Sequence, residues 1–127
     1  MRIEHVAFPC IDPVAAAAWY IEHFGLRIVR KTDDVTHTHF LADESGSIIE
    51  IYNNPKVEVP DYSSMHALLL HMAFTVEDME ATFAKLLEAG CSIDQEIVQM
   101  PNGDVLAMLR DPWGFAVQLV KRDKAML

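Results

Sequence analysis

The spacing of apolar residues along the chain is typical of strands in some segments and of helices in others, and the same order of segments occurs twice. The first half predicts a strand over residues 2–8, a helix over Val14–Phe24, and strands over Leu26–Arg30, Thr36–Leu41 and Ser47–Tyr52. The second half predicts a strand over Leu69–Thr75, a helix over Asp78–Ala89, and strands over Ser92–Val98, Val105–Arg110 and Phe115–Lys121. The repeated order β-α-β-β-β predicts an α+β fold made of two similar modules.

Specific residues mark the ends of the predicted elements. Asp12-Pro13 supplies an acidic N-cap and a proline at the first helical position, and Gly25 is a typical C-terminal glycine. Gly90 ends the second helix, and Pro101-Asn102-Gly103 indicates a hairpin turn. Residues 53–65 contain Asn-Asn-Pro and Pro-Asp, so we expect an irregular connector between the halves.

The two halves also repeat in sequence. His5-Val6-Ala7-Phe8 returns as His71-Met72-Ala73-Phe74, and Asp12 returns as Asp78. Late in each half, one polar residue interrupts an apolar strand, as Ile49-Glu50-Ile51 and as Val117-Gln118-Leu119. Because side chains alternate across a strand, each histidine and each of these polar residues is predicted on the sheet face away from the helix, with Val6 and Phe8 beneath it.

These four polar residues suggest a metal site, although spacing alone does not bring them together. Two histidines, one glutamate and one glutamine are suitable ligands for a divalent transition metal: His5, Glu50, His71 and Gln118. Taken singly, each residue is more often a hydrogen-bonded strand residue or a solvent-facing one. Recurrence of the pattern in register favours a shared polar site.

Composition and charge narrow the classes of function. The 127 residues suit one domain, residues 1–127, whose modules of about 2–54 and 67–122 share a core. A net charge of −9 disfavours nucleic acid and anionic membrane as partners. No apolar run approaches the ~18 residues of a membrane span, so a cytoplasmic protein is expected. Cys10 and Cys91 form no CxxC motif and are interpreted as structural thiols.

Three further residues are candidates for the walls of a substrate cavity. His37 and His39 are two positions apart in a predicted strand, which places them on one face. They could contact substrate there, or simply belong to a polar sheet face. Trp113 lies in the Asp111-Pro112-Trp113-Gly114 turn and could form a cavity lip or pack inside.

With these motifs together, the chain resembles the vicinal oxygen chelate superfamily, which includes glyoxalases, extradiol dioxygenases and bleomycin-resistance proteins. The motifs that carry the resemblance span about residues 2–121: His5-Val6-Ala7-Phe8, Tyr20 to Phe24-Gly25-Leu26, Ile49-Glu50-Ile51, His71-Met72-Ala73-Phe74, and Asp111-Pro112-Trp113-Gly114 continuing to Gln118-Leu119. The resemblance implies paired βαβββ modules whose mixed sheets form an open, cupped barrel around a metal. It also implies that His5, Glu50, His71 and Gln118 are metal ligands, the last of which is more often glutamate in the superfamily.

The resemblance implies a glyoxalase-like, metal-dependent lyase or isomerase, acting on a small molecule that chelates the metal through adjacent oxygens. Glu50 is the one carboxylate of the set and is therefore the candidate catalytic base, with pure ligation as the alternative. The divalent ion could be Ni, Zn, Mn, Co or Fe. A ferrous extradiol-type dioxygenase and a metal-free ligand-binding protein of the bleomycin-resistance kind remain alternatives. A homodimer is expected.

Overall fold

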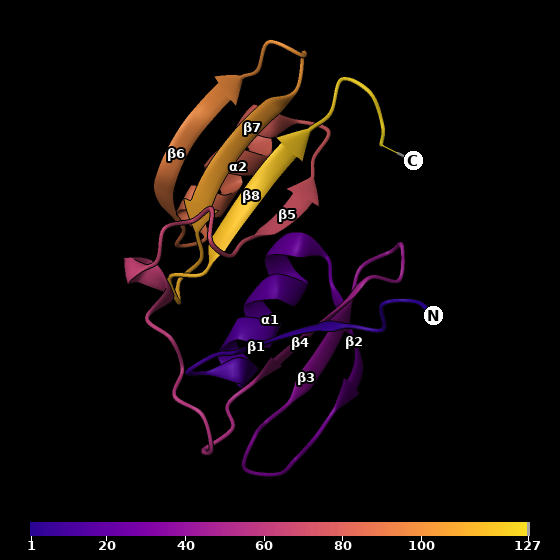
Figure 1. Ribbon diagram of the computed structural model, residues 1–127, viewed down its shortest axis with the longest axis vertical. Helices are drawn as coiled ribbons and strands as arrows, with labels where there is room; N and C mark the ends of the chain where they lie inside the picture. The colour runs from indigo at the N-terminus through magenta and orange to yellow at the C-terminus, as the bar shows by residue number, and fades with distance from the viewer. Residues whose placement is uncertain (127) are drawn as a thin grey trace. The chain divides into compact units, whose positions relative to one another are not determined.

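The computed structural model describes residues 1–126 and divides into two compact units, Met1–Pro60 and the part from Asp61 onward. The first unit contains β1 (Val6–Pro9), α1 (Pro13–Phe24), β2 (Arg27–Lys31), β3 (His39–Ala42) and β4 (Ile48–Tyr52) (Figure 1). The second contains a 3₁₀ helix, η1 (Tyr62–Ser64), then β5 (Met72–Thr75), α2 (Met79–Glu88), β6 (Ser92–Gln99), β7 (Val105–Arg110) and β8 (Ala116–Lys121). The predicted α+β class with two βαβββ modules is confirmed.

Each unit has one open, mixed, four-stranded sheet. The strand orders are β1-β4-β3-β2 and β5-β8-β7-β6. In both sheets the first strand pairs in parallel with the last strand of its module, and the other pairs are antiparallel. The histidine-bearing end of each module is therefore brought beside the strand that carries Glu50 or Gln118.

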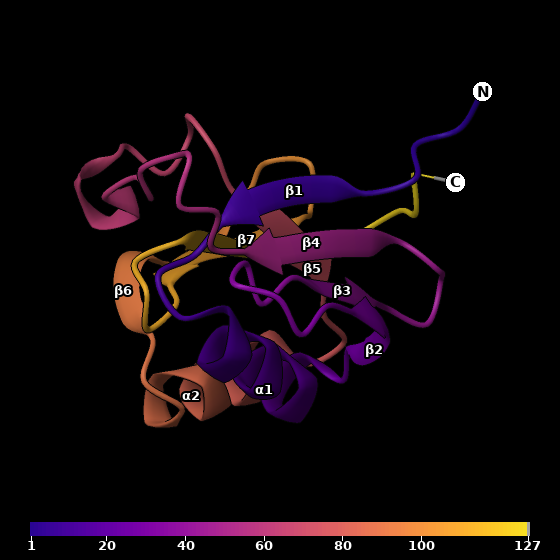
Figure 2. The same ribbon diagram turned by 90° about the horizontal axis from the view of Figure 1, so that it is seen from below.

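Each helix covers one face of its own sheet. α1 packs against β3 and β4 (Figure 2), and α2 packs against β6 and β8 (Figure 1). Asp12 and Asp78 cap the two helices, each accepting a hydrogen bond of 3.0 Å from a backbone N–H three residues later. The fully buried side chains between helix and sheet are Tyr20, Leu41 and Ile51 in the first unit, and Met79, Leu86, Leu109, Val117 and Leu119 in the second.

The repeat extends to the register of the sheets. Paired residues share a face, so the row of residues that contains Glu50 is Ala7, Glu50, Phe40 and Arg30, and the row that contains Gln118 is Ala73, Gln118, Met108 and Gln95. An extra residue interrupts the outer strand beside each row, Val29 in β2 and Asp94 in β6, and β6 has a second irregularity between Gln95 and Val98. Both modules therefore present the same strand positions on the face opposite the helix.

The turns before β4 and β8 also match. Asp43 and Asp111 each accept a backbone N–H four residues later, from Ser47 (2.9 Å) and Phe115 (2.8 Å). In each turn the glycine three residues after the aspartate has a positive φ, 90° at Gly46 and 84° at Gly114. The Asp-x-x-Gly turn is thus a third repeated feature, and the two sequences share nothing else there.

Several predicted strands are shorter in the structure. β1 begins at Val6 and β5 at Met72, so His5 and His71 each lie just before a paired strand. Phe8 is buried (6% exposed) as predicted, but the prediction for Val6 is wrong (58% exposed), because β1 is an edge strand and Val6 stands at its start.

The strand predicted over Thr36–Leu41 begins only at His39. Asp34 accepts a backbone hydrogen bond from Thr36 (2.9 Å), and Thr32 and Thr38 close the loop with a backbone hydrogen bond of 2.9 Å. These contacts hold a turn in which His37 has φ 45°. No helix within residues 1–126 is long and apolar enough to cross a bilayer.

Candidate metal centre

In the first unit, two of the four proposed ligands are in contact. His5 Nε2 lies 3.1 Å from Glu50 Oε2, and both side chains are partly buried. The register explains the contact, because Ala7 pairs with Glu50 and His5 lies two residues before Ala7, on the same face. The Phe40 ring meets the His5 ring edge-on at 5.3 Å between centroids, which limits how the imidazole can rotate.

The other ring nitrogen of His5 faces a second carboxylate. Nδ1 contacts Glu4 Oε2, and the Glu4 side chain is largely exposed to solvent. The hydrogen bond to Glu4 raises the pKa of His5 above its usual value, and partial desolvation opposes this; the charges of Glu4 and Glu50 raise the pKa further. A divalent cation bound to His5 Nε2 would replace the proton that Nε2 carries when the ring is charged.

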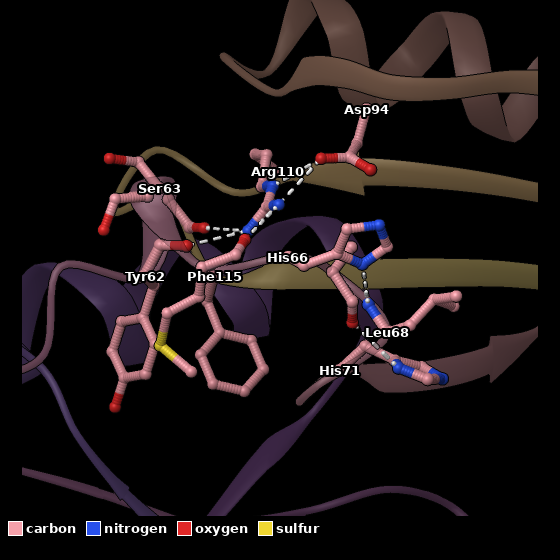
Figure 3. A network of polar contacts seen from close by, with 12 residues as sticks. Tyr62, Ser63, His66, Leu68, His71, Asp94, Arg110 and Phe115 are labelled. Carbon is pink, nitrogen blue, oxygen red and sulfur yellow. Dashed lines mark hydrogen bonds and ion pairs between the residues drawn. The ribbon is translucent and has the colours of Figure 1, made fainter.

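In the second unit, His71 is oriented by the backbone. Its Nδ1 lies 3.1 Å from the carbonyl oxygen of Ala67 (Figure 3). A carbonyl only accepts, so Nδ1 carries the proton, and in the neutral ring Nε2 keeps its lone pair. Gln118 is partly buried and pairs with Ala73, two residues after His71, which places both side chains on one face.

The structure thus brings the candidates together in pairs, one pair in contact and one pair on a common face. Within residues 1–126, no group of three or more His, Cys, Asp or Glu side chains is close enough to hold a metal ion. Each unit by itself supplies one imidazole and one oxygen donor.

The family of the chain follows from comparison with known proteins. The sequence model of the Glyoxalase/Bleomycin resistance protein/Dioxygenase superfamily matches residues 2–119. The chain belongs to this superfamily. A search of curated proteins found no match.

Solved structures of the superfamily share the fold at low sequence identity. A glyoxalase family protein from Bacillus cereus has a TM-score of 0.80 at 19% identity, covering 95% of this chain and 93% of that one. One from Enterococcus faecalis has a TM-score of 0.74 at 26% identity, covering 94% and 97%. Glyoxalase I from Zea mays has a TM-score of 0.78 at 23% identity; 98% of this chain matches 46% of that protein. This superfamily member therefore spans about half of the maize enzyme's length.

The donors of this superfamily member suit a divalent first-row metal. Imidazole nitrogen with carboxylate and amide oxygen is a set that Ni, Zn, Mn, Co and Fe accept. The 3.1 Å between His5 Nε2 and Glu50 Oε2 is close to the roughly 3 Å that separates neighbouring ligand atoms when bonds to the metal are about 2.1 Å. The hydrogen bond from His71 to a backbone carbonyl is typical of ligating histidines.

The three cavity candidates differ in where the structure places them. The prediction that His37 and His39 share a strand face is wrong, since His37 precedes β3 in a turn. His39 is buried and pairs with Ile51, which places it on the helix-facing side, opposite Glu50; its Nδ1 lies 2.7 Å from the His37 carbonyl oxygen. Trp113 is partly buried in its turn, where its backbone N–H donates to Asp111 Oδ1 (2.9 Å), and its role at a cavity stays a prediction.

A hollow of about 710 Å³ runs along the outer edge of β5. It is lined by Ala73–Glu77, Val120–Arg122, Ala125 and Met126. Ala73 is the only residue of the Gln118 row that lines it, and the hollow contains none of the predicted site residues. We therefore assign no chemistry to it.

Sequence reasoning missed the partners that hold the two histidines. Glu4 could have been noticed, because a carboxylate directly before His5 is visible in the sequence. Phe40 could be placed beside His5 only once the strand register was known. Ala67 gave no signal, since it acts through its carbonyl. Both cysteines are buried thiols. Burial, with the charge of Asp111, raises the pKa of the Cys91 thiol to about 12, so this thiol is inert.

Proposed function

We propose that the protein is a metal-dependent lyase or isomerase of the glyoxalase type, acting on a small molecule that presents two neighbouring oxygens. The ligands of its single divalent ion would be His5, Glu50, His71 and Gln118. The observation that carries the proposal is the contact of His5 with Glu50 at 3.1 Å, on a sheet face whose repeat in the second unit holds His71 and Gln118.

The charge of each proposed ligand indicates its role in the reaction. A bound divalent ion would act as a Lewis acid that polarises a substrate carbonyl. Glu50 is the only carboxylate of the four, so it would remove the proton from the carbon next to that carbonyl. The two imidazoles and the Gln118 amide are neutral donors, so the site keeps a net positive charge that favours a developing oxyanion.

We also propose that the active protein is a homodimer. Each unit holds about 60 residues, a size at which one core alone is marginal, so further burial against another unit is favoured. Sedimentation equilibrium at micromolar concentration tests this, and a monomer at every concentration would contradict it.

The function is tested by proton exchange on a substrate-like probe. Dihydroxyacetone and other small α-hydroxyketones carry the required adjacent oxygens, and exchange of their C–H protons in deuterium oxide is followed by NMR. Glu50→Gln is expected to slow exchange by about 10²-fold or more while most of the metal is retained. Glu58→Gln, in the exposed part of the connector, is the matched control and should behave as the unchanged protein.

The possible results separate the candidate functions. Unchanged exchange in Glu50→Gln would exclude Glu50 as the base. Oxygen uptake that depends on ferrous iron, without proton exchange, would indicate a dioxygenase. Ligand binding by protein that takes up no metal would indicate a binding protein and overturn the proposal.

A further inference from the structure

Arg110 lies on the sheet face that carries Gln118. It is the last residue of β7 and pairs with Ala116, while Met108 pairs with Gln118. Residues two apart on a strand face the same side, so Arg110, Met108, Ala116 and Gln118 share the face opposite α2. The Arg110 side chain is only 12% exposed, which is unusual for a charged group and requires partners.

Five hydrogen-bonding contacts surround its guanidinium group (Figure 3). Asp94 Oδ1 lies 2.9 Å from Nε and 2.7 Å from Nη2, so one carboxylate oxygen neutralises the charge. Nη1 donates to the carbonyl oxygens of Tyr62 (2.8 Å) and Gly114 (3.3 Å), and Nη2 donates to that of Met65 (2.8 Å). These acceptors need the planar, multiple donors of arginine, which a lysine does not offer.

Two of these carbonyls belong to the connector that leads to His71. Tyr62 and Met65 lie in and just after η1, and the Tyr62 ring packs on Phe115 at 4.9 Å between centroids. Two residues beyond Met65, Ala67 is 3% exposed and packs with Met108 and Ala116 on the same sheet face. Arg110 therefore holds the chain at Tyr62 and Met65, directly before the point where Ala67 packs on this face.

The held connector ends in the carbonyl that orients His71. Ala67 O accepts from His71 Nδ1 at 3.1 Å, and this bond sets which nitrogen carries the proton. The first module has no such device: Ala42 occupies the place of Arg110 in β3, and His5 is met by a side chain, Glu4.

We propose that Arg110 is a positioning residue for His71: by fixing the connector carbonyls it places Ala67 O so that the ring presents Nε2 as its free donor atom. This inference rests on the proposed function only in taking His71 Nε2 to be the atom that binds the metal. The ring geometry itself can be tested on metal-free protein.

The test compares Arg110→Lys with Arg122→Lys. Arg122 is the matched control, because it is also in the second unit and also pairs with an aspartate, Asp104, away from the connector. Nitrogen-15 shifts of the histidine rings at pH 8 report which nitrogen is protonated. Arg110→Lys should convert the Nδ1–H form at His71 into a mixture of the two neutral tautomers and leave His5 unchanged, whereas Arg122→Lys should change neither ring.

Zinc affinity, measured against a chelating dye, is the second readout. Arg110→Lys should weaken Zn²⁺ binding by about tenfold or more, and Arg122→Lys should not. Wild-type ring signals in folded Arg110→Lys, or equal changes in both variants, would overturn the proposal. If Arg110→Lys does not fold, Asp94→Asn, which keeps the shape and removes the charge partner, is judged by the same signals. Absence of Zn²⁺ binding by the unchanged protein would count against the proposed function only, because the ring signals would still decide the role of Arg110.

Discussion

Each unit holds one pair of proposed ligands, which we call a half site: His5 with Glu50, and His71 with Gln118. The two half sites share a register but differ in what holds their histidines. His5 and His71 each stand just before an edge strand, and Glu50 and Gln118 occupy matched places in the neighbouring strand. His5 is met by the carboxylate of Glu4, whose side chain is 73% exposed to solvent. His71 is met by the carbonyl of a buried alanine. Strand pairing places the donors in both units, and separate local contacts orient them.

The difference comes from the segment before each histidine. His5 directly follows Glu4, whose side chain is exposed, whereas His71 follows a connector whose Ala67 packs on its sheet face. The turns before β4 and β8 show the same difference. A Cβ on Gly46 would meet nothing within 4 Å, but one on Gly114 would lie 2.9 Å from the backbone nitrogen of Ser63 in the connector. The second half site is therefore built more rigidly than the first.

The largest expected effect tests whether the helix-facing cores are equivalent. Ile51 and Leu119 are fully buried at matched positions of β4 and β8. Ile51→Ala and Leu119→Ala should each lower the free energy of unfolding by about 2–5 kcal/mol, because each leaves a cavity in a packed core. Guanidinium unfolding measures this, with Trp19 reporting on the first unit and Trp113 on the second. If either substitution lowers the free energy of unfolding by less than about 1 kcal/mol, the two helix-facing cores are not equivalent.

A smaller effect separates the two turns. Gly46→Ala should cost about 1–2 kcal/mol, because a left-handed backbone disfavours a Cβ. Gly114→Ala should cost more, because the new methyl group also presses on the Ser63 backbone. Unfolding free energies of both variants measure the difference. Equal losses would show that the connector yields easily, contrary to the rigid support inferred for His71.

The smallest effect concerns acid stability at the two hairpin loops. The Asp104 carboxylate accepts hydrogen bonds from the Asp123 N–H (3.0 Å) and from Arg122 (2.6 Å), and these lower its pKa below 3.8. In the first unit, hydrogen bonds from Thr36 lower the pKa of Asp34. A lowered folded-state pKa gives stability that is present above pH 3.8 and is lost as the pH falls through the folded value.

Denaturant midpoints between pH 6 and pH 3 measure that loss. Asp104→Asn should reduce the fall of the denaturant midpoint with decreasing pH when unfolding is followed by Trp113 fluorescence. Asp34→Asn should do the same when unfolding is followed by Trp19 fluorescence. An unchanged pH profile in both variants would show that neither carboxylate contributes.

Much of the fold could be predicted from the sequence because it rests on local periodicity and on repetition. The Asp12 and Asp78 caps and the order of strands followed directly. The loop around His37 was mispredicted, because the Asp34 turn overrides the alternation that would continue the strand. The edge strands β1 and β5 begin later than predicted for a related reason, since a residue at the start of an edge strand, such as Val6, gains little from burial.

The candidate site, like the fold, could be predicted only in part from the sequence. Pairing of His5 with Glu50 on one face was predictable, because the period of two in a strand sets which side chains share a face. The support of His71 was not, because it passes through the backbone carbonyls of Tyr62, Met65 and Ala67, which any residue possesses. Only the folded connector shows that Arg110 reaches them.

Metal content of purified protein tests most directly whether the two half sites serve one ion. The account predicts one divalent ion per chain in the unchanged protein. His5→Ala and His71→Ala should each lower the affinity sharply, although the two residues lie in different units, whereas Glu58→Ala in the exposed part of the connector should not. Two independent ions per chain, or loss of metal on changing only one of the two histidines, would contradict it.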